Sequence, residues 1–75
     1  MKPELWLMLM DSAKADKSKA ELTLSILSKH PAGTGDHSTT DFYNNAEDAL
    51  RMLVDAVDRI NMLDSLNRAE ALIKG

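Results

Sequence analysis

Apolar side chains recur with helical spacing through the second half of the chain. The steps between them are four, four, three, four and three residues, close to the heptad spacing of packed helices. The members of this stripe are Phe42, Ala46, Leu50, Leu53, Val57 and Ile60. Four neighbours widen it: Ala49, Val54, Ala56 and Leu63. The pattern predicts a helical region over residues 39–64.

Both ends of this region carry boundary signals. The Ser-Thr-Thr-Asp segment at 38–41 matches a helix start, where short polar side chains cap free backbone amides. The apolar stripe then fails at Asp64 and Asn67. We therefore expect a shift, a kink or a break near Asp64–Ser65, followed by terminal helical turns over 65–74.

The first helical region is predicted over residues 3–30. Pro3 suits a first helical turn, and Pro31 follows the last. Because no Gly or Pro interrupts this stretch, one long helix with a possible kink is favoured over two helices separated at Asp11–Ser12 or at Asp16. Residues 17–30 also alternate like a strand, but the rest of the chain offers no partner strand, so a helix is expected.

The loop at 31–38 contains Pro31, Gly33 and Gly35, which suit a reversal of the chain. The predicted fold is therefore all-α: one small domain over residues 1–75, built as an antiparallel helical hairpin with short extra helices at its ends. Its expected core is Leu5, Trp6, Leu9, Leu24, Leu27, Phe42, Ala46, Leu50, Leu53, Val57 and Ile60.

The length and composition of the chain indicate that its fold needs a partner for stability. A chain of 75 residues buries little surface, and with no cysteine it lacks disulfides as a support. The apolar run Leu5–Met10 is more than a hairpin can cover, so we expect a homodimer that completes a helical bundle. A different protein partner, a membrane surface or a plain monomer are the alternatives. The predicted interaction surface is Leu5, Trp6, Met8, Leu9, Met10 and Met52.

Charge and hydropathy argue against other classes. The net charge of −3 does not favour nucleic-acid binding, which needs a basic patch. Leu5–Met10 is far shorter than the roughly 20 residues of a membrane-spanning helix, and it lacks the flanks of a signal peptide. The sequence therefore predicts a cytoplasmic protein without a membrane partner.

The loop holds the few candidates for chemistry. His30, Asp36 and His37 could together offer nitrogen and oxygen ligands to a metal ion, but their spacing matches no metal motif. Each histidine also has an ordinary role, as a cation at a helix end or as a hydrogen-bonding loop residue. We therefore expect no metal, no cofactor and no catalytic site.

The segment 31–37 resembles a loop of small uncharacterised proteins from tailed bacteriophages, including those of cyanobacteria. There a Pro-x-Gly-x-Gly-Asp/Glu-His loop joins two Leu-rich helices, and the matching residues here are Pro31, Gly33, Gly35, Asp36 and His37. The likeness covers roughly residues 20–60. It implies an accessory phage protein in the host-cell cytoplasm, with a host or virion protein as a partner and no established activity.

Taken as a sequence, the chain is predicted to be a non-enzymatic interaction or regulatory protein that acts through an oligomeric helical surface. The alternative is a small-ligand or metal-binding module built on the His30–His37 loop.

Overall fold

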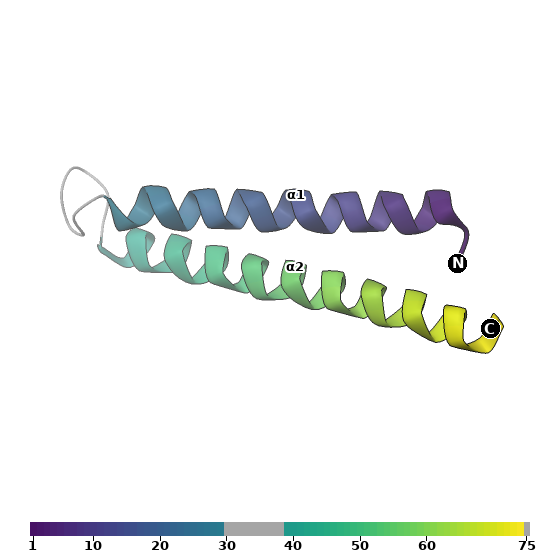
Figure 1. The fold of residues 1–75 in the computed structure, drawn as a ribbon. Coiled ribbons are helices and arrows are strands. Elements are labelled where there is room, and N and C mark those ends of the chain that lie inside the picture. Colours follow the sequence, from purple (N-terminus) through teal and green to yellow (C-terminus); the bar gives the residue numbers. More distant parts are fainter. Residues whose placement is uncertain (30–38, 75) are drawn as a thin grey trace.

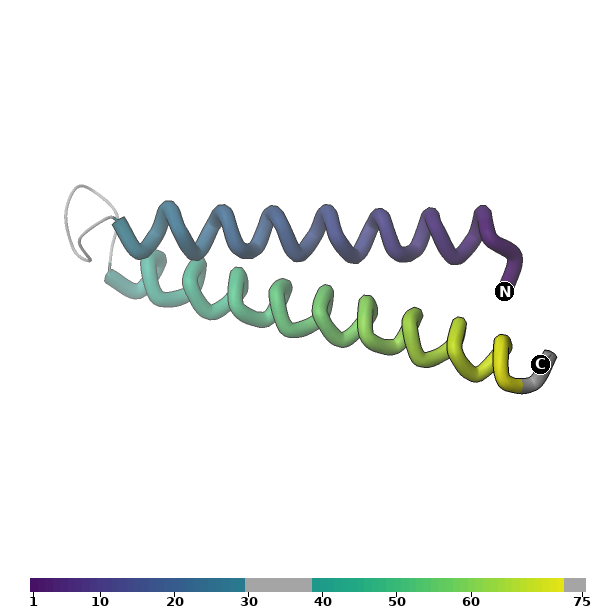
Figure 2. Tube along the Cα trace, viewed as in Figure 1, coloured from purple at the N-terminus to yellow at the C-terminus, as the bar shows by residue number. Residues whose placement is uncertain are grey.

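The computed structural model describes residues 1–29 and 39–74 and is all-helical in that part of the chain. Helix α1 spans Pro3–Ser28 and helix α2 spans Thr39–Lys74. The two helices run antiparallel and side by side, as a hairpin (Figure 1). Met1 and Lys74 therefore lie at one end of the molecule, called the terminal end here, and Lys29 and Thr39 lie at the connecting end (Figure 2). The predicted all-α hairpin is confirmed, and the predicted loop at 31–38 lies outside the described residues.

Helix α1 is continuous, which confirms the favoured prediction of one long helix. Pro3 occupies the first turn, where its missing N–H costs no hydrogen bond, and the amide of Trp6 donates to the carbonyl of Lys2 at 3.1 Å. At the other end the amide of Lys29 donates to the carbonyl of Ile26 at 3.1 Å. No break occurs at Asp11–Ser12 or at Asp16. The strand alternative for residues 17–30 is wrong over the described residues, because 17–28 are helical.

Helix α2 is also continuous, and this corrects two predictions. The break near Asp64–Ser65 is wrong, since one helix of 36 residues passes through it. The short extra helices are wrong as well for residues 1–29 and 39–74, where the predicted terminal turns belong to α2. Residues 62–74 contain no Gly or Pro, and most are good helix formers, so nothing local ends the helix there.

The seam between the helices is built from small side chains. Six residues are buried in the described part of the chain, and they lie three or seven residues apart along each helix, which keeps them on one side of it. They are Met10, Ala13 and Ala20 on α1, and Ala49, Ala56 and Leu63 on α2. Ala13, Ala20 and Ala56 have no exposed surface at all. Alanine at these positions lets two helices approach closely, because interaxial distance depends on the side chains at the contact.

This seam corrects the predicted core. Leu5, Leu9 and Leu50 were expected inside, but their side chains are 47 %, 37 % and 53 % exposed. Two of the three buried residues on α2 are Ala49 and Ala56, each one residue before a larger apolar residue of the predicted stripe. The remaining predicted core residues are half-buried at the seam: Trp6, Leu24, Leu27, Phe42, Ala46, Leu53, Val57 and Ile60.

Trp6 ties the two helices together near the terminal end. Its indole Nε1 donates a hydrogen bond to the backbone carbonyl of Leu63 at 3.1 Å, in partly buried surroundings. That carbonyl belongs to a helix interior and accepts this bond as an additional one, since a carbonyl oxygen has two lone pairs. The bond fixes the height of α1 relative to α2, where height means position along the long axis of the hairpin.

Replacing Trp6 by Phe keeps an aromatic ring at the seam but removes the donor to Leu63. We expect the free energy of unfolding to fall by about 1 kcal/mol, the usual net value of one hydrogen bond, with a further loss from the smaller ring. Urea unfolding followed by circular dichroism measures it. An unchanged midpoint would show that this bond does not contribute to stability.

Candidate interaction surface

The hairpin is far more extended than a lone domain of its size. Its dimensions are 58 × 16 × 15 Å and its radius of gyration is 17.1 Å, against about 11 Å for a compact 75-residue chain. Its accessible surface is 5719 Å², against about 4600 Å² for a typical monomer of 8.3 kDa. The excess of about 1,100 Å² is larger than the roughly 800 Å² that each partner buries in a standard protein–protein interface. The molecule therefore exposes about one interface more than a compact monomer would.

Much of this surface is apolar. Two packed helices form a single layer of contact, so each keeps the larger part of its circumference in solvent. The large apolar side chains that are at least 37 % exposed are Met1, Leu5, Leu7, Met8, Leu9, Leu22, Ile26, Tyr43, Leu50, Met52, Val54, Met62, Leu66 and Leu72. Single exposed leucines are ordinary, but a set this large is unusual on a small monomeric chain.

Asp16 and Arg59 mark one side of the hairpin. An Arg59 Nη atom donates to an Asp16 carboxylate oxygen at 2.6 Å, across the two helices, and the two side chains are 36 % and 32 % exposed. Arg59 Nε also donates to Asp55 at 2.9 Å within α2. The hydrogen bond to Asp16 and the nearby charge of Asp55 raise the pKa of Arg59 above its ordinary value, although desolvation opposes the shift. The guanidinium is therefore held charged and oriented between two carboxylates.

A set of apolar residues shares this side with the ion pair. Seven residues make two helical turns, so Leu9 and Leu66 follow Asp16 and Arg59 toward the terminal end on the same side of each helix. Leu5, three turns from Asp16, joins them. Toward the connecting end the same step reaches Thr23 and Met52. We call this side the ion-pair face, and its members are Leu5, Leu9, Asp16, Thr23, Met52, Arg59 and Leu66.

A shallow groove confirms the register of this face near the connecting end. Its volume is about 260 Å³, and Thr23 of α1 and Met52 of α2 both line it. The seam alanines Ala20 and Ala49 form part of its wall, so the hollow arises where two small side chains meet. The other lining residues are Leu27, Asn45 and Asp48.

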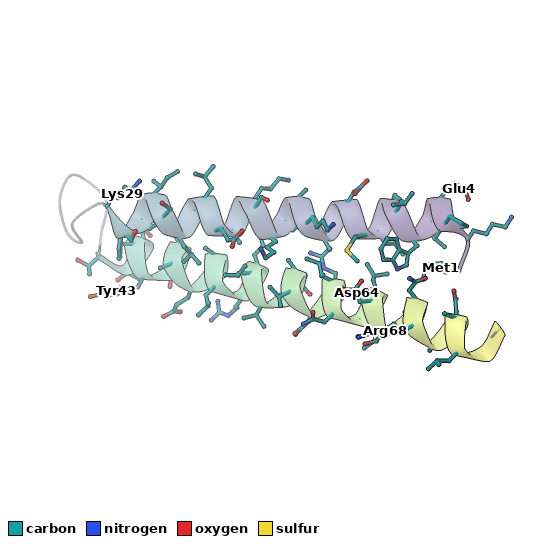
Figure 3. The ribbon with its side chains drawn as sticks, in the orientation of Figure 1. Met1, Glu4, Lys29, Tyr43, Asp64 and Arg68 are labelled. Carbon is teal, nitrogen blue, oxygen red and sulfur yellow. The ribbon has the colours of Figure 1, made fainter. Side chains whose placement is uncertain are left out.

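The opposite face of the hairpin is divided between apolar and polar residues. On α2 it carries Tyr43, Leu50 and Val54, which are 55 %, 53 % and 51 % exposed. On α1 the corresponding positions are Leu7, which is 52 % exposed, and the exposed Lys14 and Glu21. Figure 3 shows the side chain of Tyr43 at the connecting end, and Phe42 packs edge-on to its ring with 5.9 Å between ring centroids. Leu7 and Leu50 lie far apart along the hairpin, so over residues 1–29 and 39–74 it is the ion-pair face that brings an exposed leucine of α1 level with one of α2.

The structure divides the predicted interaction surface. Leu5, Met8, Leu9 and Met52 are exposed, and all but Met8 lie on the ion-pair face. Met10 is 3 % exposed and belongs to the seam, and Trp6 is half-buried there. The composition of the run at residues 5–10 indicated exposed apolar surface, but only the register of the seam separates the inner residues of that run from the outer ones.

The sequence indicates the ion pairs within each helix but not the two that join the helices. The spacing of Lys17 and Glu21, of Asp48 and Arg51, and of Asp55 and Arg59 within their helices predicts three ion pairs, and all three form, at 3.5, 3.0 and 2.9 Å. The predicted pairs are three or four residues apart in one helix, where spacing alone indicates contact. Asp16 and Arg59 are 43 residues apart, so their contact depends on the register of the hairpin. The amino group of Met1 pairs with Glu70 in the same way.

The predicted metal candidates His30, Asp36 and His37 lie outside the described residues. Within residues 1–29 and 39–74 no group of three His, Cys, Asp or Glu side chains is placed to hold a metal ion. Neither α1 nor α2, over the residues described, contains an apolar stretch long enough to cross a bilayer.

No known protein family, no curated protein and no solved structure matches the chain. The surfaces of the hairpin are therefore the guide to its function.

Proposed function

We propose that this protein is a non-enzymatic interaction module that associates with a second copy of itself through its exposed helical surface. The observation that carries the proposal is the balance of surface. Only six residues of the described chain are buried, whereas fourteen large apolar side chains remain exposed. A homodimer reduces that exposure with no further component.

The energetics of the hairpin support the same conclusion. Its buried side chains are four alanines, one methionine and one leucine, and alanine contributes little burial free energy at about 25 cal/mol per Å². Two long helices must also be ordered against a large loss of conformational entropy. A second layer of side chain contacts would supply the missing burial, as it does in helical bundles built from two hairpins.

Thermal unfolding at different protein concentrations tests this proposal. When folding and association are coupled, the melting temperature rises with concentration because the dimer is favoured by mass action. For a dimer of this size we expect a rise of about 3–6 °C for each tenfold increase in concentration. Circular dichroism at 222 nm over a range from low micromolar to near millimolar measures it. A melting temperature that stays constant over this range would contradict self-association.

A further inference from the structure

We infer that the second copy docks on the ion-pair face, with a twofold axis that runs along the length of the hairpin. This inference rests on the proposed self-association and goes beyond it by naming the face and the orientation. In this arrangement α1 of one chain lies on α2 of its partner, and four helices form a bundle in which every adjacent pair is antiparallel. Such neighbours oppose their helix dipoles favourably.

The charges on this face are complementary to themselves. An axis along the hairpin keeps each residue at its own height and exchanges the positions of α1 and α2. Asp16 and Arg59 lie side by side at one height, so Asp16 of each chain comes to face Arg59 of its partner. Asp16 and Arg59 of the two chains then form a square of alternating charge, in which each Asp16 carboxylate meets two guanidinium groups while Asp55 stays paired with Arg59 of its own helix.

The apolar residues obey the same symmetry. Leu9 and Leu66 each lie seven residues from the ion pair toward the terminal end, so Leu9 of one chain faces Leu66 of the other. Both are partly exposed in the hairpin, at 37 % and 42 %. Leu5, which is 47 % exposed, extends this contact toward the terminal end. The proposed dimer thus covers the leucine side chains that each hairpin alone leaves exposed.

The connecting end fits this arrangement as well. Thr23 and Met52 lie level with each other beside the groove, so Met52 of the partner approaches Thr23. The Thr23 hydroxyl already donates to the carbonyl of Lys19 at 2.9 Å, which leaves its methyl group for an apolar contact. Met52 is 43 % exposed, and its flexible thioether side chain suits a hollow of about 260 Å³.

The competing orientation is an end-over-end dimer. A twofold axis across the hairpin at the ion pair would place Asp16 against Asp16 and Arg59 against Arg59. It would also place Leu9 against Thr23 and Leu66 against Met52. Like charges then face each other directly, which is unfavourable at close range. The lengthwise axis avoids this repulsion and pairs leucine with leucine.

Charge reversal tests the face. Asp16→Arg and Arg59→Asp should each place like charges against one another in the homodimer and weaken dimerisation by about tenfold or more. Mixing the two variants should restore a dimer, because each positive pair then meets a negative pair. Sedimentation equilibrium of each variant and of the equimolar mixture measures both effects. The matched control is Arg51→Asp, whose ion pairs are made within α2, and it should dimerise like the unaltered protein.

Two spin-labelled variants test the orientation without altering the face. Glu4→Cys and Ser18→Cys place labels on exposed residues of α1 in a chain that has no native cysteine. With the lengthwise axis, both label pairs lie at equal heights, and the two distances between chains should agree within about 5 Å. An end-over-end dimer separates the Glu4 labels along the bundle by about 36 Å and the Ser18 labels by about 6 Å.

The outcomes separate this inference from the proposal on which it rests. A monomeric unaltered protein overturns both. A dimer that tolerates both charge reversals overturns the ion-pair face and leaves self-association in place. Restored dimerisation in the mixture with equal label distances supports the inference, whereas a clearly longer Glu4 distance overturns the lengthwise axis.

Discussion

A double variant with Leu9→Glu and Leu66→Glu should be monomeric at concentrations where the unaltered protein is a dimer. In the proposed dimer these residues face each other across the twofold axis, so the variant loses the burial of four leucines. Each buried leucine contributes about 1.5–3 kcal/mol, and the new carboxylates would be desolvated beside one another. We expect the dissociation constant to rise by at least a hundredfold, as measured by sedimentation equilibrium.

The chain offers a matched control for this variant. Leu22 and Leu72 are also one leucine from each helix, and they are more exposed, at 62 % and 83 %. Their positions lie on the outer sides of the hairpin, away from the ion-pair face. Leu22→Glu with Leu72→Glu adds the same charge and should leave the dimer intact. Equal weakening by the two double variants would indicate a general effect of charge and would argue against a specific face.

Enlarging a seam alanine should destabilise the protein. Ala13 and Ala56 have no exposed surface, so Ala13→Leu or Ala56→Leu must push the helices apart. Overpacking of this kind costs about 1–3 kcal/mol, and a rigid contact between two backbones is at the upper end. Urea unfolding at one fixed protein concentration measures the loss.

Ala15→Leu is the control for the seam. Ala15 lies on α1 two residues from Ala13, and it is exposed. Leucine and alanine have similar helix propensities, so this variant should change the free energy of unfolding by less than about 0.5 kcal/mol. A loss as large as that of Ala13→Leu would mean that α1 packs with a different side toward α2.

The predictable part of this fold lies in the helices. The all-helical class, the starts near Pro3 and Thr39 and the ion pairs within each helix follow from local spacing, which the structure confirms. The register of the seam was harder to predict. Leu50 and Val57 are larger than Ala49 and Ala56, and a stripe drawn through the largest residues selects the wrong line. Close helix packing favours the smaller residue of each pair.

The same choice of stripe explains the wrong break near Asp64–Ser65. A line through Leu50 and Val57 meets Asp64 two turns later, which resembles the end of an apolar face. A line through Ala49 and Ala56 meets Leu63, which is buried, and the pattern continues without a shift. Asp64 therefore lies beside the seam, and the buried line of residues on α2 is not interrupted there.

The candidate surface was predictable only in outline. The surplus of apolar residues at positions 5–10 indicated a surface for a partner before any geometry was known. The ion-pair face could not be predicted from the sequence, because it depends on Asp16 and Arg59 meeting across the two helices. Contacts between residues far apart in sequence depend on register, and no local pattern encodes them.

We propose that two copies of this chain associate through the ion-pair face. The mass of the unaltered protein tests the association most directly. Sedimentation equilibrium at tens of micromolar protein should give a species of twice the 8.3 kDa chain mass, which dissociates on dilution. A single species of one chain mass that persists up to high micromolar concentration would contradict self-association.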